Sequence, residues 1–194
     1  DVIDVVVQEA TEDVHRMGAV GPLAENYLEA NFVTVWRNRA FWLSCLFIAE
    51  LFTFTALAHF DEAINELVVL ALFVPLCIST GGNSGSQAST LVIRALALGE
   101  VQLADWWRVM RRELLAGLVL GAILGSIGFL RIAVWSAFST VYGEHWMLVG
   151  ITVSVSLVGV VLWGTLSGSL LPFLMRRLGF DPATSSAPFV ATLV

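Results

Sequence analysis

A glycine- and amide-rich polar run, from Pro75 to Thr90, interrupts a long apolar segment of this chain. Apolar residues lead into the run from Leu67 to Ile78 and continue after it from Leu91 to Leu98. The interior of a bilayer offers no water to irregular backbone, so such a break persists only where protein buries it or where it lines a wet cavity. The run therefore predicts a broken membrane-spanning helix, a structure that commonly binds ions or small polar solutes.

The composition indicates an integral membrane protein. Of the 194 residues, 57% are hydrophobic and 13% are charged, and the mean hydropathy is +0.82. A soluble domain is nearer half apolar and about a quarter charged. The formal net charge is −6 and every basic residue is arginine, so there is no basic stripe for nucleic acid. The sequence also shows no nucleophile–base set and no phosphate loop, and the chain is not expected to be an enzyme.

Apolar blocks long enough to cross a bilayer predict five membrane-spanning helices. They cover residues of about 40–58, 64–98, 114–134, 147–174 and 185 onward, and the chain ends within the fifth. The second block, of 35 residues, would measure about 52 Å as one helix, against an apolar core of about 30 Å. A kink at Pro75 and unwinding at Gly81-Gly82 would absorb the excess. The predicted fold is an all-α, five-helix membrane bundle with a broken second helix and a truncated fifth helix.

The first 30 residues are polar and acidic, and they are predicted to form a cytoplasmic segment before a pore domain of residues 31–194. Apolar residues recur there at helical spacing, which predicts an amphipathic helix that ends at Gly18 and Gly21-Pro22. Its acidic residues include Glu9, Glu12 and Asp13. A solvated acidic face is the favoured explanation from the sequence alone, and a cation-sensing or gating helix is the sharper alternative.

Arginine placement predicts the orientation of the bundle. Three connections carry most of the arginines and are assigned to the cytoplasmic side, together with the N-terminus. These arginines are Arg37, Arg39, Arg108, Arg111, Arg112, Arg176 and Arg177. Arg131, near the outer end of the third span, is the exception. We expect a multi-pass protein of a bacterial-type plasma membrane, and the apolar stretch at Val194 suggests part of a longer protein.

The chemistry around the predicted break favours a cation. A half-helix that ends near Thr80 would leave carbonyl groups free, with partial negative charge, whereas one that restarts near Ala88 would offer N–H groups to an anion. Nearby oxygen-bearing side chains favour the first of these outcomes. They are Asn83 and Gln87 in the run, Asp61, Glu62 and Glu66 at the outer mouth, and Glu50 within the first span.

Glu50 and the polar run each have a second interpretation. A carboxylate at the middle of a span should face the bundle interior and have a partner. Glu50 is equally well explained as a protonated packing residue. The run could be a loop between two helices outside the membrane, but the flanking pieces of about 15 and 10 residues are too short to cross. Oxygen ligands suit a hard ion, without choosing among magnesium, sodium and calcium.

Glycines at intervals of four residues predict close helix packing in the third and fourth spans. They are Gly117, Gly121 and Gly125 in the third span and Gly164 and Gly168 in the fourth. The two cysteines, Cys45 and Cys77, lie in apolar segments, and inert packing is the expected role of both.

Several stretches resemble the MgtE family of magnesium channels. The signature residues are Pro75, Gly81-Gly82-Asn83, Gln87, Arg94-Ala-Leu-Ala97 and Gly99. Residues 8–17 look like the connecting plug helix of that family, and residues 187–194 look like the start of its last transmembrane helix. The resemblance covers the whole chain and is specific in these three places.

The resemblance implies a homodimer of five-helix subunits, with a pore on the dimer axis lined by the second and fifth helices. A hydrated magnesium ion would be held there by backbone carbonyl groups. The residues implied as metal ligands are Gly82, Gly85 and Ala191. Those implied to shape or line the pore are Asn83, Gln87 and Pro75. The essential acidic residue of the family is expected just after Val194.

The predicted function is a magnesium-selective channel that admits hydrated Mg²⁺ to the cytoplasm down its electrochemical gradient. Glu9, Glu12 and Asp13 would bind regulatory cations, and the expected partners are a second copy of the chain, membrane lipid and divalent cations. The alternative is a secondary transporter that exchanges the cation for Na⁺ or H⁺, with Glu50 as the relay. A third hypothesis is a membrane scaffold that conducts no ions.

Overall fold

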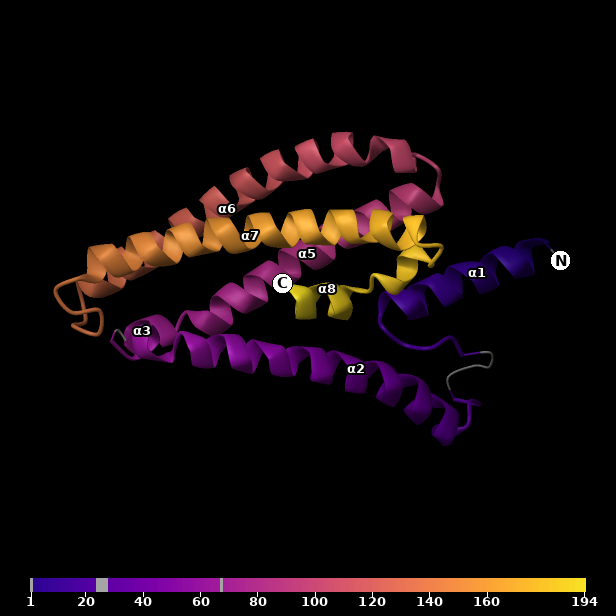
Figure 1. Ribbon diagram of the computed structural model, residues 1–194, viewed down its shortest axis with the longest axis horizontal. Coiled ribbons are helices and arrows are strands. Elements are labelled where there is room, and N and C mark those ends of the chain that lie inside the picture. Colours follow the sequence, from indigo (N-terminus) through magenta and orange to yellow (C-terminus); the bar gives the residue numbers. More distant parts are fainter. Residues whose placement is uncertain (1, 24–27, 67) are drawn as a thin grey trace.

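The computed structural model describes residues 2–23, 28–66 and 68–194, and these residues form helices and connections with no strand among them (Figure 1). The described elements are α1 (Val2–Met17), α2 (Phe32–His59), α3 (Asp61–Glu66), α4 (Val68–Ala71), α5 (Val74–Ala97), η1 (Leu103–Asp105), α6 (Trp106–Ser136), α7 (Trp146–Arg177), η2 (Pro182–Thr184) and α8 (Ala187–Leu193). The all-α prediction is confirmed.

Within the described residues, four helical segments are long and apolar enough to cross a membrane, judged by length and composition. They are Phe32–His59, Val68–Ala97, Leu103–Ser136 and Trp146–Arg177. The fifth predicted span corresponds to α8, which has seven described residues. The five-helix bundle therefore remains a prediction, whereas its first four members are present as helices of spanning length.

The two N-terminal helices, α1 and α2, lie outside the group formed by α5, α6 and α7 (Figure 1). α1 confirms the predicted amphipathic helix and is followed by a turn in which Ala19 adopts a φ of 55°. α2 begins about eight residues before the predicted start, because the Asn31 side chain accepts a hydrogen bond from the Val33 N–H at 2.9 Å and caps the helix. Among its described residues α2 buries only Leu46, so most of its surface is available to lipid or to another chain.

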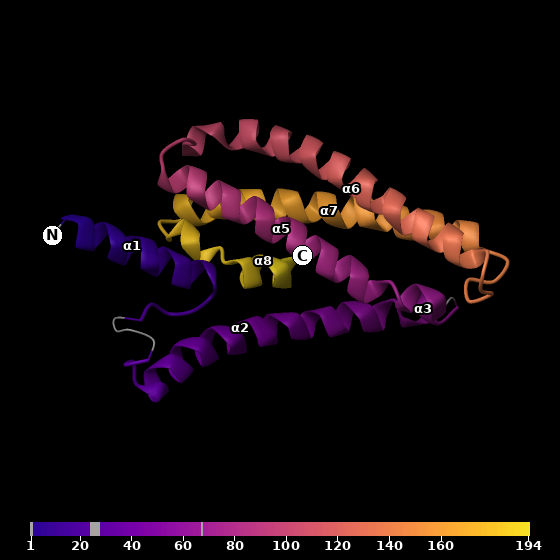
Figure 2. The ribbon, with the colours of Figure 1, turned by 180° about the vertical axis from the view of Figure 1, so that it is seen from behind.

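α6 and α7 form a long antiparallel pair, visible from both sides of the molecule (Figure 2). Glycines of α6 permit their close approach. A Cβ placed on Gly121 would lie 2.8 Å from the Cα of Val158, and one on Gly125 would lie 2.9 Å from the Ser154 carbonyl oxygen. The Ser154 hydroxyl donates to the Gly125 carbonyl at 2.8 Å. The packing predicted from the glycine spacing is confirmed.

α5 crosses α7 through glycines on both helices. A Cβ on Gly164 would lie 2.5 Å from the Gly81 carbonyl oxygen, and one on Gly168 would lie 2.9 Å from the Gly85 Cα. Gly81 and Gly85 thus meet Gly164 and Gly168 in a contact with no intervening side chain. A larger residue at Gly164 or Gly168 would meet the backbone of α5, whereas one at Gly81 would first meet the Val160 and Val194 side chains.

The second span is interrupted, but the predicted unwinding at Gly81-Gly82 is wrong. α5 is a continuous α-helix from Val74 to Ala97, and it includes Gly81-Gly82. The glycines serve close packing rather than unwinding, and a helix satisfies its own backbone groups inside a membrane. The interruption lies earlier, at the turn of residues 72–73, and Pro75 occupies the first turn of α5, where its missing N–H costs no helical hydrogen bond.

The arginine-rich connections share one end of the molecule, as predicted. The start of α2, the start of α6 and the end of α7 all lie toward the right in Figure 1, while the α2–α3 and α6–α7 connections lie at the opposite end. α8 starts from the arginine-rich end and runs back alongside α5, so that the C-terminal residue lies near the middle of the bundle.

Candidate functional site

The start of α8 is attached to α5 by serine hydroxyl groups. The Ser86 hydroxyl donates to the Ala187 carbonyl at 3.0 Å, and the Ser89 hydroxyl donates to the Ser185 carbonyl at 2.9 Å. Ser186 caps α8, since its hydroxyl oxygen accepts a hydrogen bond from the Phe189 N–H. Ser89, Ser185 and Ser186 are at most 1% exposed. These bonds set the register of α8 against α5.

Gly82 and Ala191 meet as a result of that register. A Cβ on Gly82 would lie 3.1 Å from the Ala191 Cβ and 3.3 Å from its Cα. Gly82 is the fifteenth of the 30 residues in the apolar segment Val68–Ala97, so the contact lies at the middle of that span. The structure therefore brings together two of the three predicted ligand residues at half the depth of the span.

Gly85, the third predicted ligand residue, faces the interior of the subunit. It is buried, and its backbone packs against Gly168 of α7. Because α5 is continuous through this region, the free carbonyl ends predicted near Thr80 and the free N–H groups near Ala88 do not exist. The carbonyl oxygens of α5 offer only their second lone pairs, which suit contact with the water shell of an ion.

The opposite face of α5 exposes a polar stripe. Its members recur at intervals of three or four residues and are Ser79, Asn83, Gln87, Thr90 and Arg94. Thr90 is satisfied by the Ser86 carbonyl at 2.9 Å. Within the part of the chain that the structure describes, Asn83 and Gln87 have no hydrogen-bond partner. Unpaired amides on a spanning helix require water or another polar surface. Pro75 is also exposed, two turns before Asn83.

Glu50 of α2 is exposed and lines a hollow of about 740 Å³ between α2 and α8. Ser44 and Thr192 contribute polar groups to the same hollow, whose other walls are mainly apolar. The expected charge partner of Glu50 is not found among the residues that the structure describes.

The acidic residues predicted at the outer mouth all belong to the short helix α3. Asp61 and Glu62 are exposed in its first turn, and the side chain of Glu66 lies outside the described part. The described residues contain no group of three or more histidine, cysteine, aspartate or glutamate side chains placed to hold a metal ion. Binding of a cation along α5 would thus depend on amide and carbonyl oxygens.

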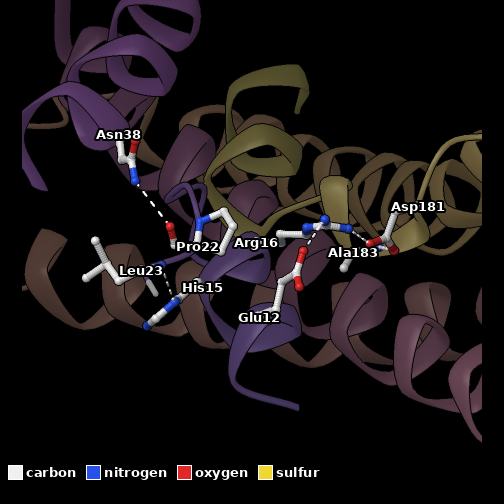
Figure 3. Close-up of polar contacts among 8 residues, drawn as sticks. All are labelled: Glu12, His15, Arg16, Pro22, Leu23, Asn38, Asp181 and Ala183. Atoms are coloured by element: carbon white, nitrogen blue, oxygen red, sulfur yellow. Dashed lines mark hydrogen bonds and ion pairs between the residues drawn. The ribbon is translucent and has the colours of Figure 1, made fainter. Parts of the chain in front are cut away.

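The acidic face of α1 docks beneath the connection between α7 and α8 (Figure 3). Arg16 bridges Glu12 of its own helix and Asp181, whose other carboxylate oxygen accepts from the Ala183 N–H at 2.9 Å. Burial and the neighbouring carboxylate of Asp181 raise the pKa of Asp13, while Arg16 acts in the opposite direction. The negative charges of Glu12 and Glu9 also raise the pKa of Asp13, so these three carboxyl groups are close enough to interact electrostatically.

Comparison with known proteins shows the family to which this sequence belongs. Residues 74–194, which begin at the first residue of α5 and include α8, match the sequence profile of MgtE, described as a divalent cation transporter. The chain belongs to the MgtE family. The resemblance drawn from the glycine-rich signature is confirmed, and membership in a transporter family agrees with the expectation of a membrane protein that is not an enzyme.

Curated MgtE proteins are similar along the whole of this chain. The magnesium transporter MgtE of Thermus thermophilus is 43% identical over 193 residues, and the match covers 41% of that protein. The proteins of the same name from Enterococcus faecalis and Bacillus subtilis are each 31% identical, with 40% and 41% of their lengths covered. The chain therefore spans about two fifths of the length of these curated relatives.

Two features of the MgtE site were missed by sequence reasoning. One is the attachment of α8 by Ser86 and Ser89, whose spacing of three residues on the face of α5 next to the glycines was an available signal. The other is the bridge from Arg16 to Asp181, which joins residues 165 positions apart and has no local signal in the sequence.

Proposed function

We propose that this chain forms the membrane part of a magnesium transporter, which acts as a channel for hydrated Mg²⁺. The observation that carries the proposal is the exposed, unpaired amide face of α5 at Asn83 and Gln87, beside the Gly82–Ala191 contact. The choice of magnesium is supported by the curated relatives, each of which is named a magnesium transporter.

The chemistry of this face suits an ion that retains its water. Mg²⁺ gives up its water ligands reluctantly and is commonly held through them. Gly82 is buried against Ala191, which is itself exposed, and the exposed Asn83 amide offers an oxygen next to this contact. We assign Gly82, Ala191, Asn83 and Gln87 to the ion path. Gly85 has a packing role in this proposal, since its backbone lies against α7.

The path is completed by a second copy of the chain. A polar stripe on a spanning helix is costly against lipid, and two copies related by a twofold axis would place two such stripes across a shared, wet passage. Pro75 would line this passage near one end, and Gln87 would line it one turn beyond Asn83. The unpaired amides thus acquire water on the passage side instead of lipid.

The arginine-rich end of the bundle is assigned to the cytoplasm of a bacterial-type plasma membrane, with α1 on that side. An inward electrochemical gradient would drive Mg²⁺ toward it. Cations bound by Glu9, Glu12 and Asp13 would regulate conduction through the docking of α1 beneath Asp181. These cations would favour closure, so linkage requires that they bind the closed state more tightly than the open state.

Gly82→Leu tests the path directly. A leucine side chain at this position would occupy the contact with Ala191, where even a Cβ has 3.1 Å. In proteoliposomes that contain a Mg²⁺ indicator, we expect uptake to fall at least tenfold. Gly159→Leu is the matched control, because a Cβ at Gly159 meets no atom within 4 Å. Normal uptake by Gly82→Leu, with both variants folded and reconstituted equally, would refute the path.

Coupled exchange is a second candidate because Glu50 lines the hollow beside α8. A channel carries Mg²⁺ without a Na⁺ or proton gradient, and Glu50→Gln should leave that flux intact. An exchanger would show no flux until the counter-ion gradient is imposed, and Glu50→Gln would abolish it. The same liposomes separate the two mechanisms.

A further inference from the structure

The start of α6 presents a cluster of arginines at the edge of an apolar span. Arg108, Arg111 and Arg112 are all exposed, and the last two follow Arg108 by three and four residues, so both lie on the same side of the helix as Arg108. The apolar part of α6 follows from Leu114 onward. Trp106 and Trp107 precede the cluster with ring centroids 5.6 Å apart, and tryptophan is typical of the membrane–water boundary.

Two hollows lie on either side of this helix start. The first has a volume of about 530 Å³ and is lined by Trp107 and the three arginines. The second, of about 530 Å³, lies between η1, α6 and α7 and is lined mainly by apolar side chains. Ala104 contributes to both, so a charged hollow and an apolar hollow are adjacent.

The charge of the first hollow is not neutralised by its own residues. Arg108 pairs with Asp105 at 3.0 Å. Within the described part of the chain, Arg111 and Arg112 form no salt bridge, although Glu113 follows Arg112 directly. Arg177 adds a further positive charge at the edge of the second hollow. This excess of positive charge occurs on a chain whose net charge is −6.

We propose that this surface binds an anionic phospholipid. The phosphate lies in the arginine hollow, where guanidinium groups donate paired hydrogen bonds to its oxygens, and an acyl chain lies in the apolar hollow against Trp106, Leu170 and Phe173. Anionic lipids attract basic clusters at the ends of spanning helices. A soluble phosphate would use only the first hollow, whereas a phospholipid explains both hollows and their common edge.

The bound lipid would stabilise the end of the ion-path helix. Phe173 is 5% exposed and packs with Val92 and Leu96 of α5, with Val109 of α6 beside them. A lipid chain over Phe173 therefore covers the cluster that joins the ends of α5, α6 and α7. This effect does not depend on which ion the protein carries.

Native mass spectrometry of the purified chain, with added phosphatidylglycerol or phosphatidylcholine, tests the proposal. We expect at least tenfold tighter retention of phosphatidylglycerol, and loss of this preference in Arg111→Gln/Arg112→Gln. The control is Arg37→Gln/Arg39→Gln, an exposed arginine pair on α2 at the same end of the molecule, and it should retain the preference. An equal loss in both double variants would overturn the proposal, because it would indicate attraction without a defined site.

A quenching measurement keeps the test valid if the variants are unstable. Phosphatidylglycerol brominated on its acyl chain should quench tryptophan fluorescence more than brominated phosphatidylcholine, and Trp106→Phe should remove most of the difference. Inorganic phosphate at millimolar concentration should not displace the lipid. Full displacement by phosphate, absence of a quenching difference, or loss of lipid binding in a longer chain whose other domains cover this face would each refute the proposal.

Discussion

Gly168→Ala tests whether the glycines of α5 and α7 serve close packing. A Cβ at this position would lie 2.8 Å from the Gly85 carbonyl carbon and 2.9 Å from its Cα, with the carbonyl oxygen closer still. These are backbone atoms, which cannot rotate away. An ordinary contact begins at 3.4 Å, and the carbonyl oxygen is the nearest atom, so the two helices would have to separate by about 1 Å.

The expected cost follows from this displacement. Overpacking of a close-packed interior costs about 1–3 kcal/mol. The higher helix propensity of alanine recovers at most about 1 kcal/mol. For a chain of this size each kcal/mol corresponds to about 2–4 °C, so we expect a melting temperature roughly 2–12 °C below that of Gly159→Ala, which gains the same helix propensity without the overpacking. Mg²⁺ uptake should also fall, because a displacement of α5 would move Gly82, which is assigned to the ion path.

Gly159→Ala in the same helix is the control. Its added methyl group would meet no atom within 4 Å, and we expect its melting temperature to equal or slightly exceed that of the parent chain. The assay is thermal unfolding in detergent at one fixed lipid content. If Gly168→Ala melts within a degree of Gly159→Ala, the two backbones are not in contact there, and the packing explanation of the glycine-rich run is wrong.

Two other predictions concern the supports of the site. Ser89→Ala removes the buried hydrogen bond to the Ser185 carbonyl and should lower the free energy of unfolding by about 1–3 kcal/mol. The control is Ser126→Ala, which removes an exposed hydrogen bond within α6 and should change the free energy of unfolding little in the same assay. Because burial and Asp181 raise the pKa of Asp13 above 3.8, docking of α1 should strengthen as the pH falls through that raised pKa and weaken above it. Spin-label distances between α1 and η2 would show this dependence, and its persistence in Asp13→Asn would contradict the assignment.

The sequence predicted the spans because length and apolarity act locally. α6 and α7 cover the predicted third and fourth spans and extend past them by eight residues or fewer at either end. The spacing of Gly117, Gly121 and Gly125 predicted a close helix contact along α6, since a helix face without side chains has few uses in a membrane other than close approach, and the structure shows α7 as the partner. These predictions needed no knowledge of which helix would be the partner.

The break in α5 was predicted wrongly because glycine has two opposite uses in a membrane helix. It permits unwinding, and it also permits close approach of a second backbone. Only the position of α7 distinguishes these uses, and Gly164 lies about 80 residues away from Gly81 and Gly85. The fact that both helices carry glycines four residues apart was the available signal for packing.

The continuity of α5 bears on how the proposed channel would select a hydrated ion. A broken helix would present bare carbonyl groups, which can replace the water of an ion, as a dehydrating filter requires. In α5 those carbonyl groups are already used along the helix, and the exposed groups are the amides of Asn83 and Gln87. Two amide side chains offer too few oxygens to replace the whole water shell of an ion. Discrimination would therefore depend on the size and strength of the retained shell, which favours the ion that dehydrates most reluctantly.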